Sequence, residues 1–211
     1  MADIPAAIEP TRLLPEAHYG APGEGVAARL RAGFSAATLA ARRGALPALA
    51  ARFADAGLIL PDGPKAATAG GLTLIGTGPG RWLAFAEGAG VLPGRLLPLA
   101  EGLAAVTDQS DASLLFEIAG PKVRAALAKG VMVDLDPSVF RAGDAATTTV
   151  AHVNLTFWQA GEIVGDMAGD MAGGTPSYVF AVPRSFAPAF LRWLASSAAE
   201  FGFTVSGTGR G

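Results

Sequence analysis

Apolar residues between positions 35 and 110 recur with two different spacings, one typical of strands and one typical of helices. Short runs rich in apolar and β-branched residues predict strands, and Pro47 at the start of a run through Leu49 and Phe53 predicts a helix. Gly78-Pro79-Gly80 between two apolar runs indicates a hairpin turn. The predicted order is β-α-β-β-α-β, at residues 36–42, 47–56, 72–77, 82–87, 93–103 and 105–108.

The same order returns after position 110. The predicted elements are a strand, a short helix, a strand or bent pair of strands, a strand, a long helix and a last strand, at residues 113–119, 121–129, 147–159, 178–182, 185–200 and 201–206. In the long helix, Phe186, Phe190 and Leu194 fall on one face together with Trp193. Ser185 is the predicted N-cap.

The two passes predict an α+β fold in which two ferredoxin-like βαββαβ halves, residues 35–110 and 111–211, pack together. Residues 1–34 hold many prolines and glycines and show no persistent period, so they are predicted to be an extended N-terminal arm. Such an arm is either a partly ordered tail or a segment that orders on a partner. Its candidate anchors are Leu13, Leu14, Tyr19 and Phe34.

Composition narrows the classes of function. The chain has 211 residues, a formal net charge of -2 and 51% hydrophobic residues, which gives neither the basic field needed for nucleic acid nor a disordered composition. The sequence holds no cysteine, which excludes disulfides, thiolate nucleophiles, iron–sulfur clusters and thiolate zinc sites. The N-terminus does not resemble a signal peptide and no stretch reads as a membrane span, so we expect a soluble cytoplasmic protein.

Gly76-Thr77-Gly78-Pro79-Gly80 resembles part of a dinucleotide fingerprint. However, Arg81 stands where the third glycine is needed, and the next segment reads as a strand. The tandem Gly-Asp-Met-Ala of residues 165–172 lacks the alternating oxygen ligands and closing Glu of a calcium loop. We interpret the first as a hairpin turn and the second as a loop.

The remaining titratable candidates also have structural interpretations. The only histidines are His18, in the arm, and His152, expected in a strand; spacing gives His152 neither the orienting group nor the cleft that a general base needs. The carboxylate pairs Asp108/Asp111 and Asp134/Asp136 could suggest acid–base chemistry but are ordinary at turns. Trp158, on the more polar side of its strand, is the aromatic residue expected to meet a partner. No catalytic, cofactor-binding or metal-binding residue is predicted on this chain.

An ordered series of segments resembles the gamma subunit of heterotetrameric sarcosine oxidase, which is related to the folate-binding aminomethyltransferase (T-protein) family. The segments with the strongest resemblance are Asp134-Leu135-Asp136-Pro137, Val182-Pro183-Arg184-Ser185-Phe186, Phe190-Leu191-Arg192-Trp193-Leu194 and Gly78-Pro79-Gly80-Arg81-Trp82-Leu83. The resemblance is best between residues 72 and 203.

The resemblance implies an oxidoreductase complex of alpha, beta, gamma and delta subunits. Such complexes oxidise sarcosine to glycine, form hydrogen peroxide and pass the one-carbon unit to tetrahydrofolate. FAD, FMN and NAD would lie in the two large subunits and zinc in the smallest, with no cofactor on the gamma chain. The catalytic Asp and folate-binding carboxylates of the T-protein have no match at positions of this sequence.

Three interpretations stay open at this point. The favoured one is a non-catalytic gamma subunit that supports assembly. The others are a free-standing folate-binding aminomethyltransferase-like protein and an isolated binding module. For the favoured interpretation, the candidate interface residues are Leu13, Leu14, Tyr19, Arg42, Arg43 and Trp158.

Overall fold

The computed structural model describes residues 13–88, 90–162 and 175–207. The chain divides into two compact units. The five-stranded unit consists of residues 33–113 with 143–146, and the seven-stranded unit holds the rest of the described chain. The predicted mixed α+β fold class is confirmed.

The five-stranded unit follows the order of elements expected from the sequence. Its sheet runs β4-β5-β6-β3-β7, and every neighbouring pair is antiparallel. The elements are β3 (Phe34–Ala41), α1 (Leu46–Asp55), β4 (Ala66–Ala69), β5 (Leu72–Gly78), β6 (Arg81–Glu87), α2 (Val91–Ala100) and β7 (Ala104–Asp108). The short strand β4 was not predicted.

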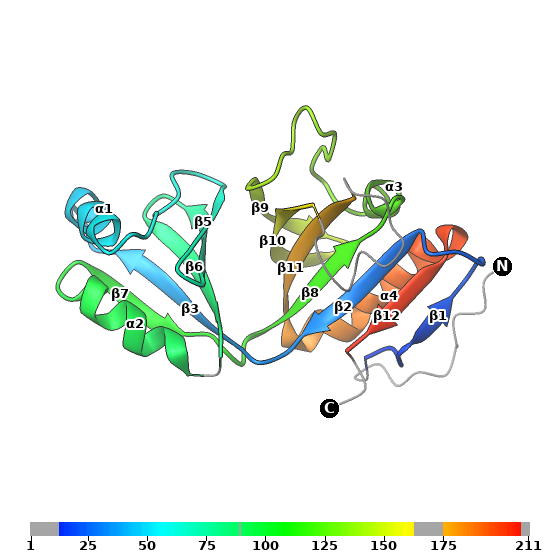
Figure 1. Cartoon of the computed structure of the whole chain (residues 1–211), viewed down its shortest axis with the longest axis horizontal. Coiled ribbons are helices and arrows are strands. Elements are labelled where there is room, and N and C mark those ends of the chain that lie inside the picture. The colour runs from blue at the N-terminus through cyan, green and yellow to red at the C-terminus, as the bar shows by residue number, and fades with distance from the viewer. Residues whose placement is uncertain (1–12, 89, 163–174, 208–211) are drawn as a thin grey trace. The chain divides into compact units, whose positions relative to one another are not determined.

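The core of the five-stranded unit lies between one sheet face and the helices α1 and α2 (Figure 1). Alternate residues of the strands point to this face because side chains in a strand alternate between its two sides. The fully buried Leu39, Leu49, Phe53, Leu92 and Leu96 come from one strand and both helices. Burial of this stripe explains why the helical spacing could be read from the sequence.

The seven-stranded unit has a sheet with the order β1-β12-β2-β8-β11-β10-β9. Its elements are β1 (Ala17–Tyr19), β2 (Val26–Arg31), β8 (Ser113–Ala119), α3 (Val123–Leu127), β9 (Ala145–Val150), β10 (Val153–Glu162), β11 (Pro176–Pro183), α4 (Ala187–Ala198) and β12 (Phe203–Ser206). Two short 3₁₀ turns, Arg184–Phe186 and Ala199–Phe201, flank α4.

The predicted N-terminal arm is wrong for residues 17–19 and 26–31, because they form strands β1 and β2 of the larger sheet. Strand β2 lies between β12, to which it is parallel, and β8, to which it is antiparallel (Figure 1). A strand bonded on both sides is interior, whereas an arm would leave its backbone groups to solvent. Residues 1–12 of the predicted arm lie outside the described residues.

A row of aromatic rings forms the core of the seven-stranded unit. Phe157 is fully buried and stacks on Phe180, with ring centroids 4.9 Å apart, and on Phe140 at 5.4 Å. The row continues from Phe180 to Phe190 of α4 and then to Phe116 of β8. These contacts fix α4 on the sheet face that carries Phe157 and Phe180.

The predicted cap at Ser185 is wrong. The helix α4 begins at Ala187, after the 3₁₀ turn, and its N-cap residue Phe186 makes no side-chain capping bond. Phe186, expected on the core face, is 52% exposed, because the 3₁₀ turn breaks the helical spacing that would have aligned it with Phe190.

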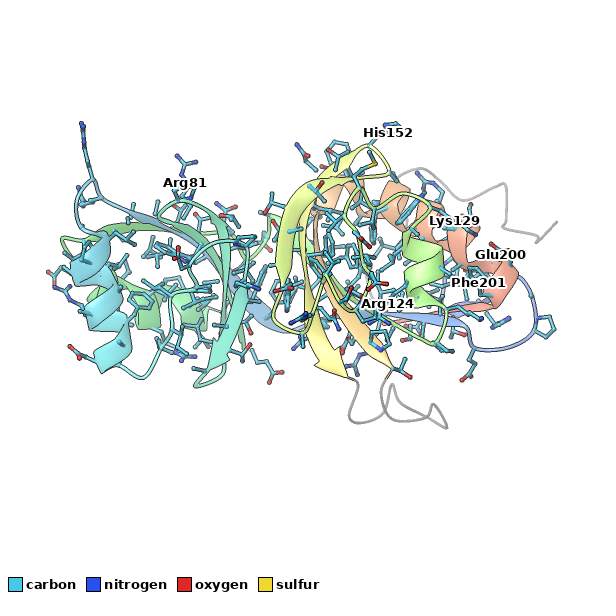
Figure 2. All side chains as sticks on the ribbon, turned by 90° about the horizontal axis from the view of Figure 1, so that it is seen from above. Arg81, Arg124, Lys129, His152, Glu200 and Phe201 are labelled. Atoms are coloured by element: carbon cyan, nitrogen blue, oxygen red, sulfur yellow. The ribbon has the colours of Figure 1, made fainter. Side chains whose placement is uncertain are left out.

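Lys129 ties the end of α3 to the end of α4. Its ammonium group donates to the carbonyl oxygen of Ser197 and to the Glu200 carboxylate, and lies 4.9 Å from the ring centroid of Phe201 (Figure 2). A cation at the end of a helix meets carbonyls that lack intrahelical partners, so this contact satisfies part of the C-terminus of α4.

Candidate interaction surface

The outward sides of α1 and α2 form an apolar surface with few charges. We define the outer helical face as the exposed residues of these two adjacent helices, which are Leu46, Pro47, Ala48, Ala50, Ala51, Ala54, Asp55, Val91, Gly94, Leu97 and Pro98. The largest apolar side chains among them are Leu97, 54% exposed, Leu46, 45% exposed, and Val91, 38% exposed. Asp55 is the single charged residue of the set.

The two arginines on these helices are directed toward backbone carbonyls rather than outward. Arg52 of α1 donates through Nη1 to the carbonyl oxygen of Glu101 at 2.9 Å and to that of Leu99 at 3.4 Å. Arg95 of α2 donates to the carbonyl oxygen of Gly70 at 2.8 Å. Arg52 thereby satisfies carbonyls at the C-terminus of α2, and the outer helical face lacks the cations that normally alternate on a solvated helix.

The structure separates the six predicted interface residues into two groups. Leu14, Tyr19 and Trp158 are buried within the chain, and the Tyr19 hydroxyl donates to the Pro15 carbonyl oxygen at 2.7 Å. They therefore offer little surface to a partner. Leu13 is half-buried, while Arg42 and Arg43 are exposed at the end of β3.

The expected polar side of the strand around Trp158 is wrong. Trp158 pairs with Val179 of β11, in the interior of the larger sheet, and Thr156 on the same side is also buried. Side-chain alternation alone assigns one face to solvent, but the consecutive residues 155–159 of β10 are all buried, so both faces of this strand are covered.

His152 lies in a turn and not in a strand. Ala151 and His152 join β9 to β10, and both have positive φ values, 46° and 69°. This is the two-residue hairpin geometry that favours Asn-Gly, and it exposes His152 at the tip of the hairpin (Figure 2). The other histidine, His18, accepts or donates through Nδ1 to Thr204 at 3.3 Å and donates through Nε2 to the Ala21 carbonyl oxygen at 2.7 Å.

The paired carboxylates lie in turns, where Asp108 and Asp136 each accept hydrogen bonds from a serine two residues later. The Ser110 hydroxyl donates to Asp108 at 2.7 Å, and this bond, with a second from the Ser110 N–H, lowers the pKa of Asp108. A bond from the Ser138 hydroxyl to Asp136, at 2.6 Å, likewise lowers the pKa of Asp136. A general base needs the opposite shift, so these carboxyls have the chemistry of turn residues.

Sequence reasoning missed a buried polar contact beside the aromatic row. Burial raises the pKa of the Tyr178 hydroxyl, and the Arg124 Nε–H, which donates to it at 3.1 Å, acts in the opposite direction. Asp136, near Arg124, lies in the segment that carries Phe140 into the core. The Asp134–Pro137 motif is therefore part of a folded turn; the pairing of residues 124 and 178, which are distant in sequence, had no local signal.

The described residues hold neither a cluster of metal ligands nor a membrane-spanning helix. No group of three or more His, Asp or Glu side chains in residues 13–88, 90–162 and 175–207 could hold a metal ion. None of the helices in those ranges is long and apolar enough to cross a membrane. The tandem Gly-Asp-Met-Ala segment lies outside the described residues.

The fold defines the class to which the chain belongs. It is similar to aminomethyltransferase T of the glycine cleavage system from Bartonella henselae, with a TM-score of 0.58, 14% identity, and coverage of 93% of this chain and 48% of that chain. That likeness concerns the fold alone. It places the chain among proteins with an aminomethyltransferase-like α+β architecture.

The sequence match to a family identifies the chain more closely than the likeness in fold does. Residues 42–200 match the family described as sarcosine oxidase, gamma subunit, and the chain belongs to this family, which confirms the resemblance read from the sequence. It is also similar to a chain of heterotetrameric sarcosine oxidase from Corynebacterium sp. U-96 in complex with pyrrole 2-carboxylate. That match has a TM-score of 0.70 and 26% identity, and covers 86% of this chain and 88% of the other.

Two curated relatives are each named sarcosine oxidase subunit gamma. The protein from Corynebacterium sp. (strain P-1) is 28% identical over 146 residues, which are 69% of this chain and 66% of the relative. The protein from Arthrobacter sp is 33% identical over 116 residues, which are 54% of this chain and 57% of the relative. The chain thus spans just under two thirds of the first relative and somewhat more than half of the second.

Proposed function

We propose that this chain is a non-catalytic gamma subunit of a heterotetrameric sarcosine oxidase and that it supports assembly of the complex. The observation that carries the proposal is the match to a chain of a heterotetrameric sarcosine oxidase over most of both chains. The outer helical face supports it physically, because an apolar surface with few charges is typical of a surface that another protein covers.

The proposal includes the reaction and the partners. The complex would oxidise sarcosine to glycine with formation of hydrogen peroxide and transfer of the one-carbon unit to tetrahydrofolate. The partners would be alpha, beta and delta subunits in the cytoplasm, with FAD, FMN, NAD and zinc on those subunits and none on this chain. This chain would then contribute by binding the other subunits and not by chemistry of its own.

The proposal also covers the architecture and the interface residues. Each unit would be one ferredoxin-like half, and the strand order β5-β6-β3-β7 with α1 and α2 on one face supports this for the five-stranded unit. In the larger unit, β2 would be a strand inserted between β12 and β8. Arg42 and Arg43 remain interface candidates because they are exposed.

Native mass spectrometry with a flavin absorption spectrum, on the chain affinity-purified from its own host, tests the subunit proposal. A flavin-coloured complex with two large partners and one small partner is expected. A colourless monomer would contradict the proposal, and tetrahydrofolate binding by that monomer would favour the free-standing aminomethyltransferase-like alternative.

A pair of charge substitutions tests the role of the outer helical face. Leu97→Glu puts a carboxylate on this face and is expected to weaken association with the partner subunits about tenfold, because a charge buried without a counter-charge is costly. Val139→Glu is the matched control, since Val139 is 58% exposed in the other unit. Equal effects of the two substitutions would remove the outer helical face from the interface.

A further inference from the structure

The outer edge of β7 presents backbone groups that no described residue bonds. Arg42 N–H donates to the Leu103 carbonyl oxygen, and Gln109 N–H donates to that of Ala36. With the register Ala40↔Ala105 and Thr38↔Thr107, the odd-numbered residues of β7 therefore bond to β3. Because backbone groups alternate along an antiparallel strand, the N–H and C=O of Ala104, Val106 and Asp108 point away from the sheet.

Each of the other sheet edges is short or has a contact at one end within the described part of the chain. Strand β1 has only three residues. At β4, the Ala66 N–H donates to the Gly143 carbonyl oxygen at 2.7 Å, and Lys65 forms an ion pair with Asp144. At β9, Val150 forms a bridge with Val131. Proteins protect edges in such ways because an open edge pairs with other strands.

The edge of β7 has little of the usual protection. Its sequence Ala104-Ala105-Val106-Thr107 holds no proline and no charge, and its ladder with β3 runs over five residue pairs without a register shift. Ala105 and Thr107 are exposed on one side of the strand. Val106, on the other side, packs against the core between the sheet and the helices. Asp108 supplies the only charge of the strand, at its end.

We propose that β7 is completed in the assembled oxidase by an extended segment of another subunit, which adds a sixth strand to the five-stranded sheet. The segment is an uncharged strand with alternating character. Its apolar side chains lie beside Val106 and continue the helix-covered layer, while small or hydroxyl side chains lie beside Ala105 and Thr107. The backbone bonds supply affinity and the alternation supplies the register. This inference rests on the proposed function.

Proline at position 106 tests the edge directly. Val106→Pro removes an N–H that points outward and leaves every β3–β7 bond in place, since Val106 N–H does not bond to β3. Val106→Ala is the matched control, because it loses the same side-chain packing and keeps the N–H. The proline variant is expected to associate with the partner subunits about tenfold more weakly than the alanine variant.

Thr107→Lys provides a second test that does not depend on how the strand tolerates proline. Thr107 is exposed, and its backbone bonds to β3 are unaffected by the side chain. A lysine on an edge strand blocks pairing, so this variant is also expected to lose partner subunits in native mass spectrometry. Circular dichroism of the isolated variants verifies that both are folded.

Amide hydrogen exchange of the wild-type chain measures the backbone hydrogen bonds of β7 without any change of side chain. The Val106 amide is expected to exchange fast in the isolated chain and slowly in the complex, whereas the Ala105 and Thr107 amides are protected in both. If wild-type chain assembles with its partners and Val106→Pro and Thr107→Lys assemble equally well, the strand proposal is wrong and the subunit proposal stands. If the wild-type chain does not assemble with partner subunits, the subunit proposal fails and the strand proposal fails with it. If β7 pairs with β7 of a second copy, the strand proposal alone fails, because the added strand does not come from another subunit.

Discussion

The two units use their helices differently. In the seven-stranded unit, α4 is buried along most of its length, and its Phe190 contacts rings from two strands and Trp193. In the five-stranded unit, α1 and α2 bury one stripe each and leave apolar residues such as Leu46 and Leu97 exposed. The helix of the larger unit therefore leaves little apolar surface exposed, whereas α1 and α2 of the five-stranded unit expose apolar side chains of the kind that other proteins cover. The comparison indicates that a layer of helices on a sheet can keep an apolar surface after its own core is filled.

The largest expected effect is on the aromatic row. Phe157→Ala removes a fully buried ring that stacks on two others, and we expect it to lower the free energy of unfolding by about 3–5 kcal/mol. Leu97→Ala, on the outer helical face, should change it by less than about 0.5 kcal/mol. Urea denaturation followed by fluorescence measures both. If both substitutions lowered the free energy of unfolding by similar amounts, the proposed difference between the two units would be wrong.

Two glycine substitutions sharpen the comparison at the level of the backbone. Gly202 has a φ of 77°, and a Cβ there would lie 2.1 Å from the Gly23 carbonyl oxygen, so Gly202→Ala should cost about 2–3 kcal/mol. Gly94 lies in α2 with open space around it, so Gly94→Ala should stabilise the chain by about 0.5–1 kcal/mol. The unfolding temperature should fall for Gly202→Ala and rise for Gly94→Ala. A change of the same sign in both variants would contradict the close approach of Gly202 to the Gly23 carbonyl oxygen.

The internal role of Arg52 can be measured separately from its charge. Arg52→Ala removes the bonds to the carbonyl oxygens of Leu99 and Glu101 and should lower stability by about 1 kcal/mol. Arg43→Ala removes an exposed arginine that is not on the two helices and should have little effect. Chemical denaturation measures the free energy of unfolding of both variants. Equal free energies would mean that Arg52 does not stabilise the end of α2.

The smallest effect is a pH dependence in the turn after β7. The Ser110 hydroxyl and N–H hold the pKa of Asp108 below its usual 3.8. A carboxyl whose pKa is lower in the folded state adds stability above the unfolded value, and this contribution is lost as the pH falls from 3.8 through the folded pKa. Asp108→Asn cannot titrate, so its stability should fall less steeply in that range than that of the wild type.

The control for this measurement is Asp62→Asn, which removes an exposed carboxylate elsewhere in the same unit. Denaturation at a series of pH values between 2 and 5 compares the three proteins. A wild-type pH dependence matching that of Asp108→Asn would show that the Ser110 bonds do not stabilise the ionised carboxyl.

Local patterns predicted most elements of the five-stranded unit because its β5–β6 hairpin and its two helices are visible in their own residue spacing, although β3 pairs with residues as distant as Asp108. The Gly78-Pro79-Gly80 turn joins β5 to β6 as predicted, and Pro47 lies in the first turn of α1. The strands of a hairpin are recognised from the turn between them, and a helix with one buried face is recognised from the spacing of its apolar residues. The outer helical face was not predicted, although the scarcity of charge on residues 46–55 and 91–100 is visible in the sequence.

Tertiary structure decided what depends on distant partners. Strand β2 is interior because it bonds to residues 115–119 and 203–206, and nothing in its own six residues encodes either partner. The same holds for Trp158, which is buried because both faces of its strand are covered, and for Phe186, which a 3₁₀ turn leaves exposed. By itself the sequence determined the family, the α+β class and the order of most elements, since these follow from motifs and local periodicity. Only the fold decided which strands are interior and which edge stays open, because strand pairing joins segments across the chain and leaves no local pattern.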